Sequence, residues 1–160
     1  MQKVSIFWFR RDLRLEDNNG LSEALKSGEK VIPIFIFDKE ILGQLEDKYD
    51  RRVDYIHQAL EKINTELKES GSNLLTFYGK PLEIFKQLQK DYDLKSVYCN
   101  RDYEPSAIKR DEEIRNSSIQ KILIFLILKT KLFLKRMKSQ KTTANLTRFT
   151  HLSQINGKNF

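Results

Sequence analysis

Four short apolar runs, each closed by polar residues, recur along the first hundred residues of the chain. They are rich in β-branched and aromatic side chains, which is typical of strands buried on both faces of a parallel sheet. The predicted strands are residues 3–9, 30–37, 73–78 and 96–100. Pro33 lies inside the second run and cannot donate a backbone hydrogen bond there, but the surrounding pattern still predicts a strand.

Helical patterns occupy the intervals between these runs. The clearest is residues 50–69, where apolar residues recur three and four positions apart until Gly71 ends the helix. Shorter helices are predicted within residues 20–28, 81–92 and 105–114. Strands that alternate with helices predict βαβ units with right-handed crossovers. The expected fold class is therefore α/β, an open doubly wound parallel sheet of the Rossmann-like type, with its ligand crevice beyond the carboxyl ends of the strands.

The composition excludes several classes of protein. A chain of 160 residues has room for one domain with a sizeable core. It has no apolar stretch of about 18 residues, and its first residues do not form a signal peptide. The single cysteine, Cys99, cannot form an internal disulfide and indicates a reducing, cytoplasmic location. Two histidines and one cysteine form no metal-ligand cluster, so we expect no metal site and no membrane association.

Two densely charged loops follow predicted strands. Residues 8–18 read WFRRDLRLEDN, and residues 100–111 read NRDYEPSAIKRD. Three arginines within five residues, followed by two acidic residues, are unusual directly after a buried strand. One interpretation is a solvated loop stabilised by salt bridges. The other is a binding site for a polar or anionic ligand, because ligands of such sheets bind beyond the carboxyl ends of the strands.

Taken together, these strings resemble the DNA photolyase/cryptochrome family. The stretch FWFRRDLRLEDN at residues 7–18 resembles the opening signature of that family. Further matches follow in order at the family's spacing: Arg51 with Arg52, Gly79 with Pro81, and residues 100–111. The resemblance covers about 115 residues, and its specificity comes from the agreement of several ordered blocks.

The resemblance implies an N-terminal α/β domain that carries an antenna chromophore, which passes excitation to FAD in a separate helical domain. Where the family binds a deazaflavin, the contacts correspond to Arg11, Asp12, Asp102 and Glu104 of this sequence. Carboxylates and a guanidinium can hydrogen-bond a polar heterocycle and its tail. Asp12 could instead pair with a neighbouring arginine, and Glu104 could be a carboxylate favoured at the start of a helix.

One departure from the family pattern bears on the chromophore. Folate-binding members place an Asn-Glu pair shortly after the Tyr-Glu of the second loop, whereas this sequence has Ser106 and Ala107 there. The resemblance therefore favours an antenna of flavin or deazaflavin type over folate, or no antenna at all. FAD itself is expected only in the full-length parent.

The last quarter of the chain differs from the rest. Residues 117–160 contain seven lysines, two arginines and no acidic residue, whereas residues 1–116 carry a slight negative net charge. The recognised resemblance stops near residue 116. We therefore expect a family domain at 1–116 and a basic tail at 117–160, with the helical FAD-binding domain absent. The physical properties of the tail predict a basic amphipathic helix or a disordered arm.

A frameshift in the gene near codon 117 would explain this change. When the last base of each codon is read with the first two of the next, residues 129–148 permit the string DQVIFEKDEVTKDDGKPYTV. That string resembles the family's own continuation. On this hypothesis the charge of the tail carries no information about DNA binding, and the fifth strand is lost. The sheet would then be incomplete at its C-terminal end, so we expect a monomer or an aggregation-prone chain.

Four functional hypotheses follow. The leading one is a fragment of a deoxyribodipyrimidine photolyase that has no catalytic residue of its own and is inactive alone, with damaged DNA as a partner of the full-length parent. The parent could equally be a cryptochrome photoreceptor. A stand-alone nucleotide-binding α/β module is a third hypothesis, although no G-x-G-x-x-G or Walker-type loop is present. The fourth is an adaptor whose basic tail binds nucleic acid.

Overall fold

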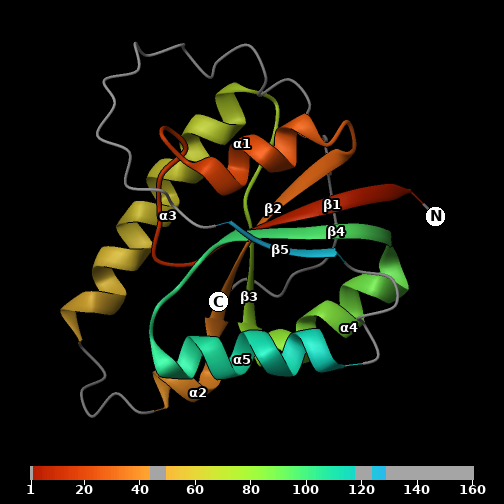
Figure 1. Ribbon diagram of the computed structural model, residues 1–160. Coiled ribbons are helices and arrows are strands. Elements are labelled where there is room, and N and C mark those ends of the chain that lie inside the picture. Colours follow the sequence, from red (N-terminus) through yellow and green to blue (C-terminus); the bar gives the residue numbers. More distant parts are fainter. Residues whose placement is uncertain (1, 44–49, 118–123, 129–160) are drawn as a thin grey trace, which may run out of the picture.

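The computed structural model describes residues 2–43, 50–117 and 124–128 of the chain. These residues form one parallel sheet with the strand order β3-β2-β1-β4-β5 and helices on both faces (Figure 1). The strands are β1 (Lys3–Phe9), β2 (Lys30–Asp38), β3 (Leu75–Gly79), β4 (Asp93–Asn100) and β5 (Ile124–Leu128). The sheet does not close on itself, so the predicted open, doubly wound α/β fold is confirmed.

Helices cover the two faces of the sheet and bury different side chains of the same strand. They are α1 (Asn19–Lys26), α2 (Lys39–Leu42), α3 (Arg51–Glu69), α4 (Pro81–Asp91) and α5 (Pro105–Asn116). On one face Trp8 of β1 packs edge-to-face against Phe85 of α4, with the ring centroids 5.4 Å apart. On the other face Phe7 shares a core with Leu21 of α1. No helix of the described residues is long and apolar enough to cross a bilayer.

The predicted elements are all present, with shifted boundaries. The third strand begins at Leu75 and the fourth already at Asp93, where the apolar pattern is still weak. The short helix α2 was not predicted. It begins at Lys39, and the side chain of the N-cap residue Asp38 accepts a hydrogen bond from the backbone N–H of Glu40 at 3.0 Å. A four-residue helix is too short to produce a periodic pattern, and the N-cap aspartate is its only sequence signal.

Pro33 is accommodated in β2 by the limited length of β3. The register pairs Pro33 with Phe7 of β1, whereas pairing with β3 begins only at Ile34, opposite Leu75. Pro33 therefore has a neighbouring strand on one side only, and its position resembles that of a residue in an edge strand.

The strand β5 corrects the expectation for the start of the tail. A fifth strand was expected to be lost, and the tail to form a helix or an arm, but residues 124–128 pair in parallel with β4. The register runs from Ser96 opposite Ile124 to Asn100 opposite Leu128. An apolar run rich in isoleucine and leucine suits a strand that satisfies the free backbone groups along the edge of β4. The remaining predictions for the tail fall on residues outside the described part.

The N-terminus of α3 provides a pH-dependent prediction. Asp50 caps this helix, accepting from the backbone N–H of Arg52 at 2.8 Å and from its Nε at 2.9 Å. These hydrogen bonds lower the pKa of Asp50 to about 2, the side-chain bond having the larger effect. A lowered carboxyl pKa stabilises the fold above its unfolded value, and this stabilisation is lost as pH falls through the folded pKa. We therefore expect Asp50→Asn to flatten the loss of stability between about pH 4 and pH 2.

Urea denaturation followed by far-UV circular dichroism at several pH values measures this effect. Asparagine caps helices about as well as aspartate, so the variant removes the charge and keeps the cap. An acid limb that is unchanged by Asp50→Asn would contradict the prediction.

Candidate ligand-binding pocket

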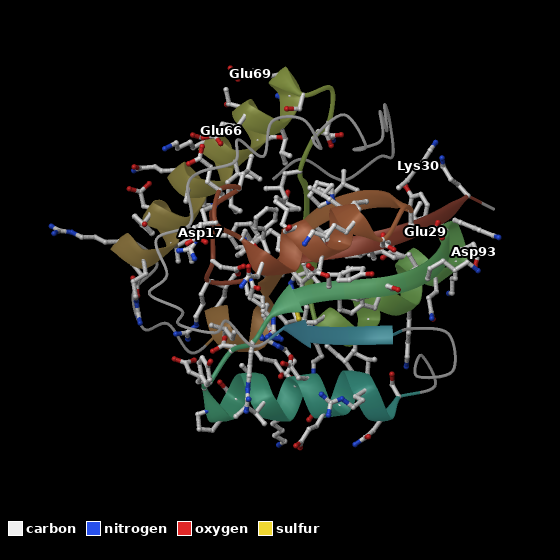
Figure 2. All side chains as sticks on the ribbon, turned by 45° about the horizontal axis from the view of Figure 1, so that its top comes forward. Asp17, Glu29, Lys30, Glu66, Glu69 and Asp93 are labelled. Carbon is white, nitrogen blue, oxygen red and sulfur yellow. The ribbon has the colours of Figure 1, made fainter. Side chains whose placement is uncertain are left out.

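A pocket lies between the loops that follow β1 and β4. These two strands are neighbours in the sheet, and the strand order reverses between them, because the chain continues from β1 to β2 on one side and returns to β4 on the other. Such a reversal is where open α/β sheets bind ligands. Figure 2 shows Asp17, from the loop after β1, at the opposite end of the sheet from Glu29, Lys30 and Asp93.

The pocket has a volume of about 440 Å³, and most of the residues that line it are of charged or polar types. Its walls come only from the two charged loops and the first turn of α5. The lining residues are Arg10, Arg11, Asp12, Arg14, Asn100, Arg101, Asp102, Tyr103, Glu104 and Pro105. All four residues predicted from the sequence are among them, so the structure brings Arg11, Asp12, Asp102 and Glu104 together although some ninety residues separate the two loops.

Arg11 joins the two loops across the pocket. Its Nε lies 3.3 Å from Oδ2 of Asp102, and its Nη2 forms an ion pair with Glu104. The side chain of Arg11 is 66% exposed, whereas that of Asp102 is only 13% exposed. Glu104 occupies the N-cap position of α5, but its side chain accepts no capping hydrogen bond. The carboxylate of Glu104 instead pairs with the guanidinium of Arg11. Glu104 therefore stands at the N-cap position without capping the helix through its side chain.

Asp12 is held by amides and not by the arginine that the sequence suggested as an alternative. Its Oδ2 accepts from Nδ2 of Asn18 at 3.2 Å and from Nδ2 of Asn100, and its Oδ1 accepts from the backbone N–H of Arg10 at 3.3 Å. Within the described residues Asp12 forms no salt bridge. Its negative charge therefore stays available to a ligand.

Asn100 connects the two loops and was missed as a functional residue in the sequence. Its Oδ1 accepts from the backbone N–H of Gly20 at 3.0 Å, and its Nδ2 donates to Asn18 at 2.8 Å. A Cβ on Gly20 would lie 2.9 Å from the ring of Phe7 and 3.0 Å from Oδ1 of Asn100, so only glycine allows this approach. Asn18 in turn caps α1 through the backbone N–H of Leu21. In the sequence, only the position of Asn100 at the end of a predicted strand could have indicated its role.

A buried charge cluster lies directly behind the pocket. Arg10 donates to both carboxylate oxygens of Asp111, at 3.1 Å through Nη1, and both side chains are 5% exposed. Arg110 lies 3.6 Å from Asp38. Burial raises the pKa of Asp111, and the nearby charge of Arg10 opposes this effect. The guanidinium carbons of Arg10 and Arg110 lie 4.6 and 4.9 Å from the ring centroid of Trp8.

Other candidate residues have structural roles. Cys99 is fully buried, and burial raises the pKa of its thiol to about 12, so it is an unreactive core residue as expected. His57 stacks on Phe37 at the surface of α3. Phe7, Trp8 and Phe9 all belong to the core. Among the described residues, no group of histidine, cysteine and carboxylate side chains could hold a metal ion.

Sequence comparison connects the chain with a group of light-responsive proteins. The family model described as DNA photolyase matches residues 5–151, which reaches beyond residue 116. The chain is 37% identical over 109 residues to a deoxyribodipyrimidine photo-lyase of Synechococcus sp., covering 68% of this chain and 22% of that protein. It is 36% identical over 119 residues to cryptochrome-1 of Drosophila melanogaster, covering 71% of this chain and 22% of that protein. The chain thus spans about a fifth of the length of these relatives.

Structural comparison agrees with the sequence. The crystal structure of an archaeal photolyase from Sulfolobus tokodaii is similar to this chain with a TM-score of 0.68 at 36% identity. The likeness covers 79% of this chain and 29% of the archaeal one. The described sheet and helices are therefore similar to one part of a much larger protein.

Proposed function

Because the chain belongs to the DNA photolyase family, we propose that its pocket between β1 and β4 binds the antenna chromophore of a photolyase or cryptochrome. The chain is the N-terminal domain of that family and spans a fragment of the length of its relatives. The observation that carries the proposal is the convergence of Arg11, Asp12, Asp102 and Glu104 on one pocket.

The chemistry and size of the pocket fit a flavin or deazaflavin. Its volume of about 440 Å³ lies in the range of small-molecule sites. Asp12 and Asp102 can accept hydrogen bonds from ring N–H groups, and the guanidinium of Arg11 can donate to ring carbonyl oxygens. The Sulfolobus tokodaii photolyase structure contains two FAD molecules, with a novel light-harvesting cofactor implied. Together with Ser106 and Ala107 in the second loop, this supports a flavin-type antenna over folate.

The residues of the pocket divide the work of binding. Asn18 and Asn100 hold Asp12 in one orientation before any ligand arrives, which lowers the entropic cost of binding. Arg11 is more exposed and can exchange its contacts with Asp102 and Glu104 for contacts to the ligand. When bound, the chromophore would absorb light and pass its excitation to FAD in the helical domain of the parent.

The activity of the parent lies outside this fragment. We propose that the full-length parent repairs pyrimidine dimers in DNA with light and FAD, and that this chain alone performs no repair. The similarity to Drosophila cryptochrome-1 favours a photoreceptor parent as the second candidate. Both parents would use the same antenna pocket, so the binding experiment below applies to either.

Replacement of Arg11 by methionine tests the proposal. We expect the purified full chain to bind FMN, FAD or an 8-hydroxy-5-deazaflavin, and Arg11→Met to raise Kd by about tenfold or more, because it removes charge-assisted hydrogen bonds. Fluorescence titration measures Kd, and methenyltetrahydrofolate serves as the comparison ligand. Arg115→Met is the matched control, because Arg115 is exposed at the far end of α5.

Two results would contradict this function. One is the absence of flavin or deazaflavin binding at millimolar concentration, and the other is equal affinity in the Arg11→Met variant and the unmodified chain. Preferential binding of the folate would overturn the choice of chromophore and leave the antenna site itself in place.

We also propose that a frameshift near codon 117 separates the tail from its parent reading frame. The change of composition at this point supports the proposal. The family model matches as far as residue 151, which indicates that part of the tail after residue 117 still resembles the family. Sequencing the gene across codons 105–130 and downstream decides the matter. An intact frame whose codons do not permit the second reading would contradict the proposal.

A further inference from the structure

Trp8 is the only tryptophan of the chain, and it lies one side chain away from the pocket. The guanidinium of Arg10 lies over its ring at 4.6 Å, and Arg10 also lines the pocket. The indole is 2% exposed and therefore has no direct route to solvent. A ligand in the pocket would thus have an electron-rich aromatic ring close behind one wall.

A tryptophan near a light-excited flavin can quench the excited state by electron transfer. One electron can leave the indole, which becomes a radical cation, and enter the excited chromophore. The electron then returns to the indole, both partners regain their ground states, and the excitation is lost as heat. An antenna that is to pass its excitation onward must suppress this transfer.

The surroundings of Trp8 oppose the loss of an electron. Two guanidinium groups lie over the ring, that of Arg10 at 4.6 Å and that of Arg110 at 4.9 Å from its centroid. A positive charge this close is attracted by the neutral ring and repelled by the radical cation, so it makes oxidation of the indole harder. In a site that excludes water the repulsion is only weakly screened.

Each of the two cations has a carboxylate beside it. Asp111 binds Arg10 through both carboxylate oxygens, and Asp38 lies 3.6 Å from Arg110. The side chain of Arg110 is 17% exposed and that of Asp38 is 8% exposed. Both guanidinium groups are therefore largely buried beside a carboxylate, with the ring of Trp8 beneath them.

Tyr103, inside the pocket, also has an arginine over its ring. Tyr103 is 66% exposed and lines the cavity, and the guanidinium carbon of Arg101 lies 5.4 Å from the centroid of its ring. Tyrosine is the second side chain that can donate an electron to an excited flavin. Two aromatic donors at this site therefore carry an arginine over the ring.

We infer that Arg110, together with Arg10, protects the excited state of a chromophore in the pocket by hindering electron transfer from Trp8. This inference rests on the proposed antenna function. Arg110 does not line the pocket, whereas Arg10 does. Arg110 would therefore act on the chromophore only indirectly, through its effect on Trp8.

Substitution of Arg110 tests the inference without altering the pocket lining. We expect Arg110→Gln to bind FMN or FAD with unchanged Kd but to shorten the fluorescence lifetime of the bound flavin by about twofold or more, because the indole becomes easier to oxidise. Arg110→Lys keeps the charge and should retain the original lifetime. The double variant Arg110→Gln/Trp8→Phe should recover it, because the electron donor is gone.

A second readout uses the chain without any flavin. Flash photo-oxidation with a ruthenium tris-bipyridine complex and persulfate measures how readily Trp8 loses an electron. Arg110→Gln should be oxidised faster than the unmodified chain, whereas Arg115→Gln on the same helix should not be. Circular dichroism and thermal melting confirm that each variant is folded before it is compared.

The outcomes separate the two proposals. An unchanged lifetime in Arg110→Gln, a shortening that persists without Trp8, or equal oxidation rates would overturn the protective role while the antenna function stands. If no flavin binds to the unmodified chain, the antenna function fails, and the inference that rests on it fails with it.

Discussion

Replacement of Asp111 by alanine is expected to lower the free energy of unfolding by about 3–5 kcal/mol, because it leaves the charge of Arg10 buried without its carboxylate. Both side chains are only 5% exposed, and the bidentate contact joins the end of β1 to α5. Urea denaturation followed by far-UV circular dichroism is the measurement. Tryptophan fluorescence is unsuitable here, because Trp8 lies beside Arg10 and would respond to the mutation directly.

A double substitution and a surface pair provide the controls for Asp111. Arg10→Met combined with Asp111→Leu should recover much of the loss, since apolar residues can replace a buried ion pair at little cost. Glu23→Ala removes an exposed partner of Lys26 and should cost about 1 kcal/mol or less. If Asp111→Ala cost no more than Glu23→Ala, the buried pair would contribute little to the fold.

Replacement of Phe7 by alanine should lower the free energy of unfolding by about 3–5 kcal/mol through the cavity that it leaves. Phe7 is fully buried, its ring lies edge-to-face with Phe9 at 4.7 Å, and Gly20 at the start of α1 packs directly on it. Urea denaturation followed by Trp8 fluorescence measures the loss, because Trp8 belongs to the core on the opposite face of the sheet.

Graded substitutions test whether the cavity is the cause. Phe7→Leu keeps much of the buried volume and should cost clearly less than Phe7→Ala. Tyr55→Ala removes a ring of similar size that is 71% exposed and should change stability by no more than about 0.5 kcal/mol. Similar losses for all three variants would contradict the cavity explanation.

We expect the substitution of Phe7 by alanine to disturb the pocket as well as the core. Phe7 supports Gly20, and the backbone N–H of Gly20 is bound by Asn100, which holds Asp12. The pocket is therefore built on the core beneath it. This explains why a pocket made of two loops can keep a defined shape: the side chain of Asn100, at the start of the second loop, is hydrogen-bonded to Asp12 and Asn18 of the first.

Much of the fold could be predicted from local patterns. Strands buried on both faces appear as continuous apolar runs, and the one-sided helix at 51–69 shows a regular three-and-four spacing. The short helix α2 and the strand β5 were not predicted. The first is too short for a period, and the second depends on a partner strand, β4, that the sequence of the tail does not reveal.

The candidate site was predictable only in part. Arg11, Asp12, Asp102 and Glu104 were selected through a resemblance to known proteins, and their convergence on one pocket confirms their proximity. Their role as chromophore ligands stays a prediction. Asn100 and the Arg10–Asp111 pair were missed, because hydrogen bonds between residues 80 to 101 positions apart leave no periodic signal in the sequence.

The sequence alone was enough to predict the alternation of the first four strands with their longer helices, the parallel α/β class and the resemblance to the family, because burial periodicity and ordered motifs are local properties of the chain. Which side chains meet follows only from the three-dimensional arrangement of these elements. The reversal of strand order between β1 and β4 brings two distant loops to one edge of the sheet. Only there can Asp12 bind Asn100, Arg11 bind Asp102, and two guanidinium groups cover Trp8. Contacts of this kind depend on distances through space, which a linear pattern does not contain.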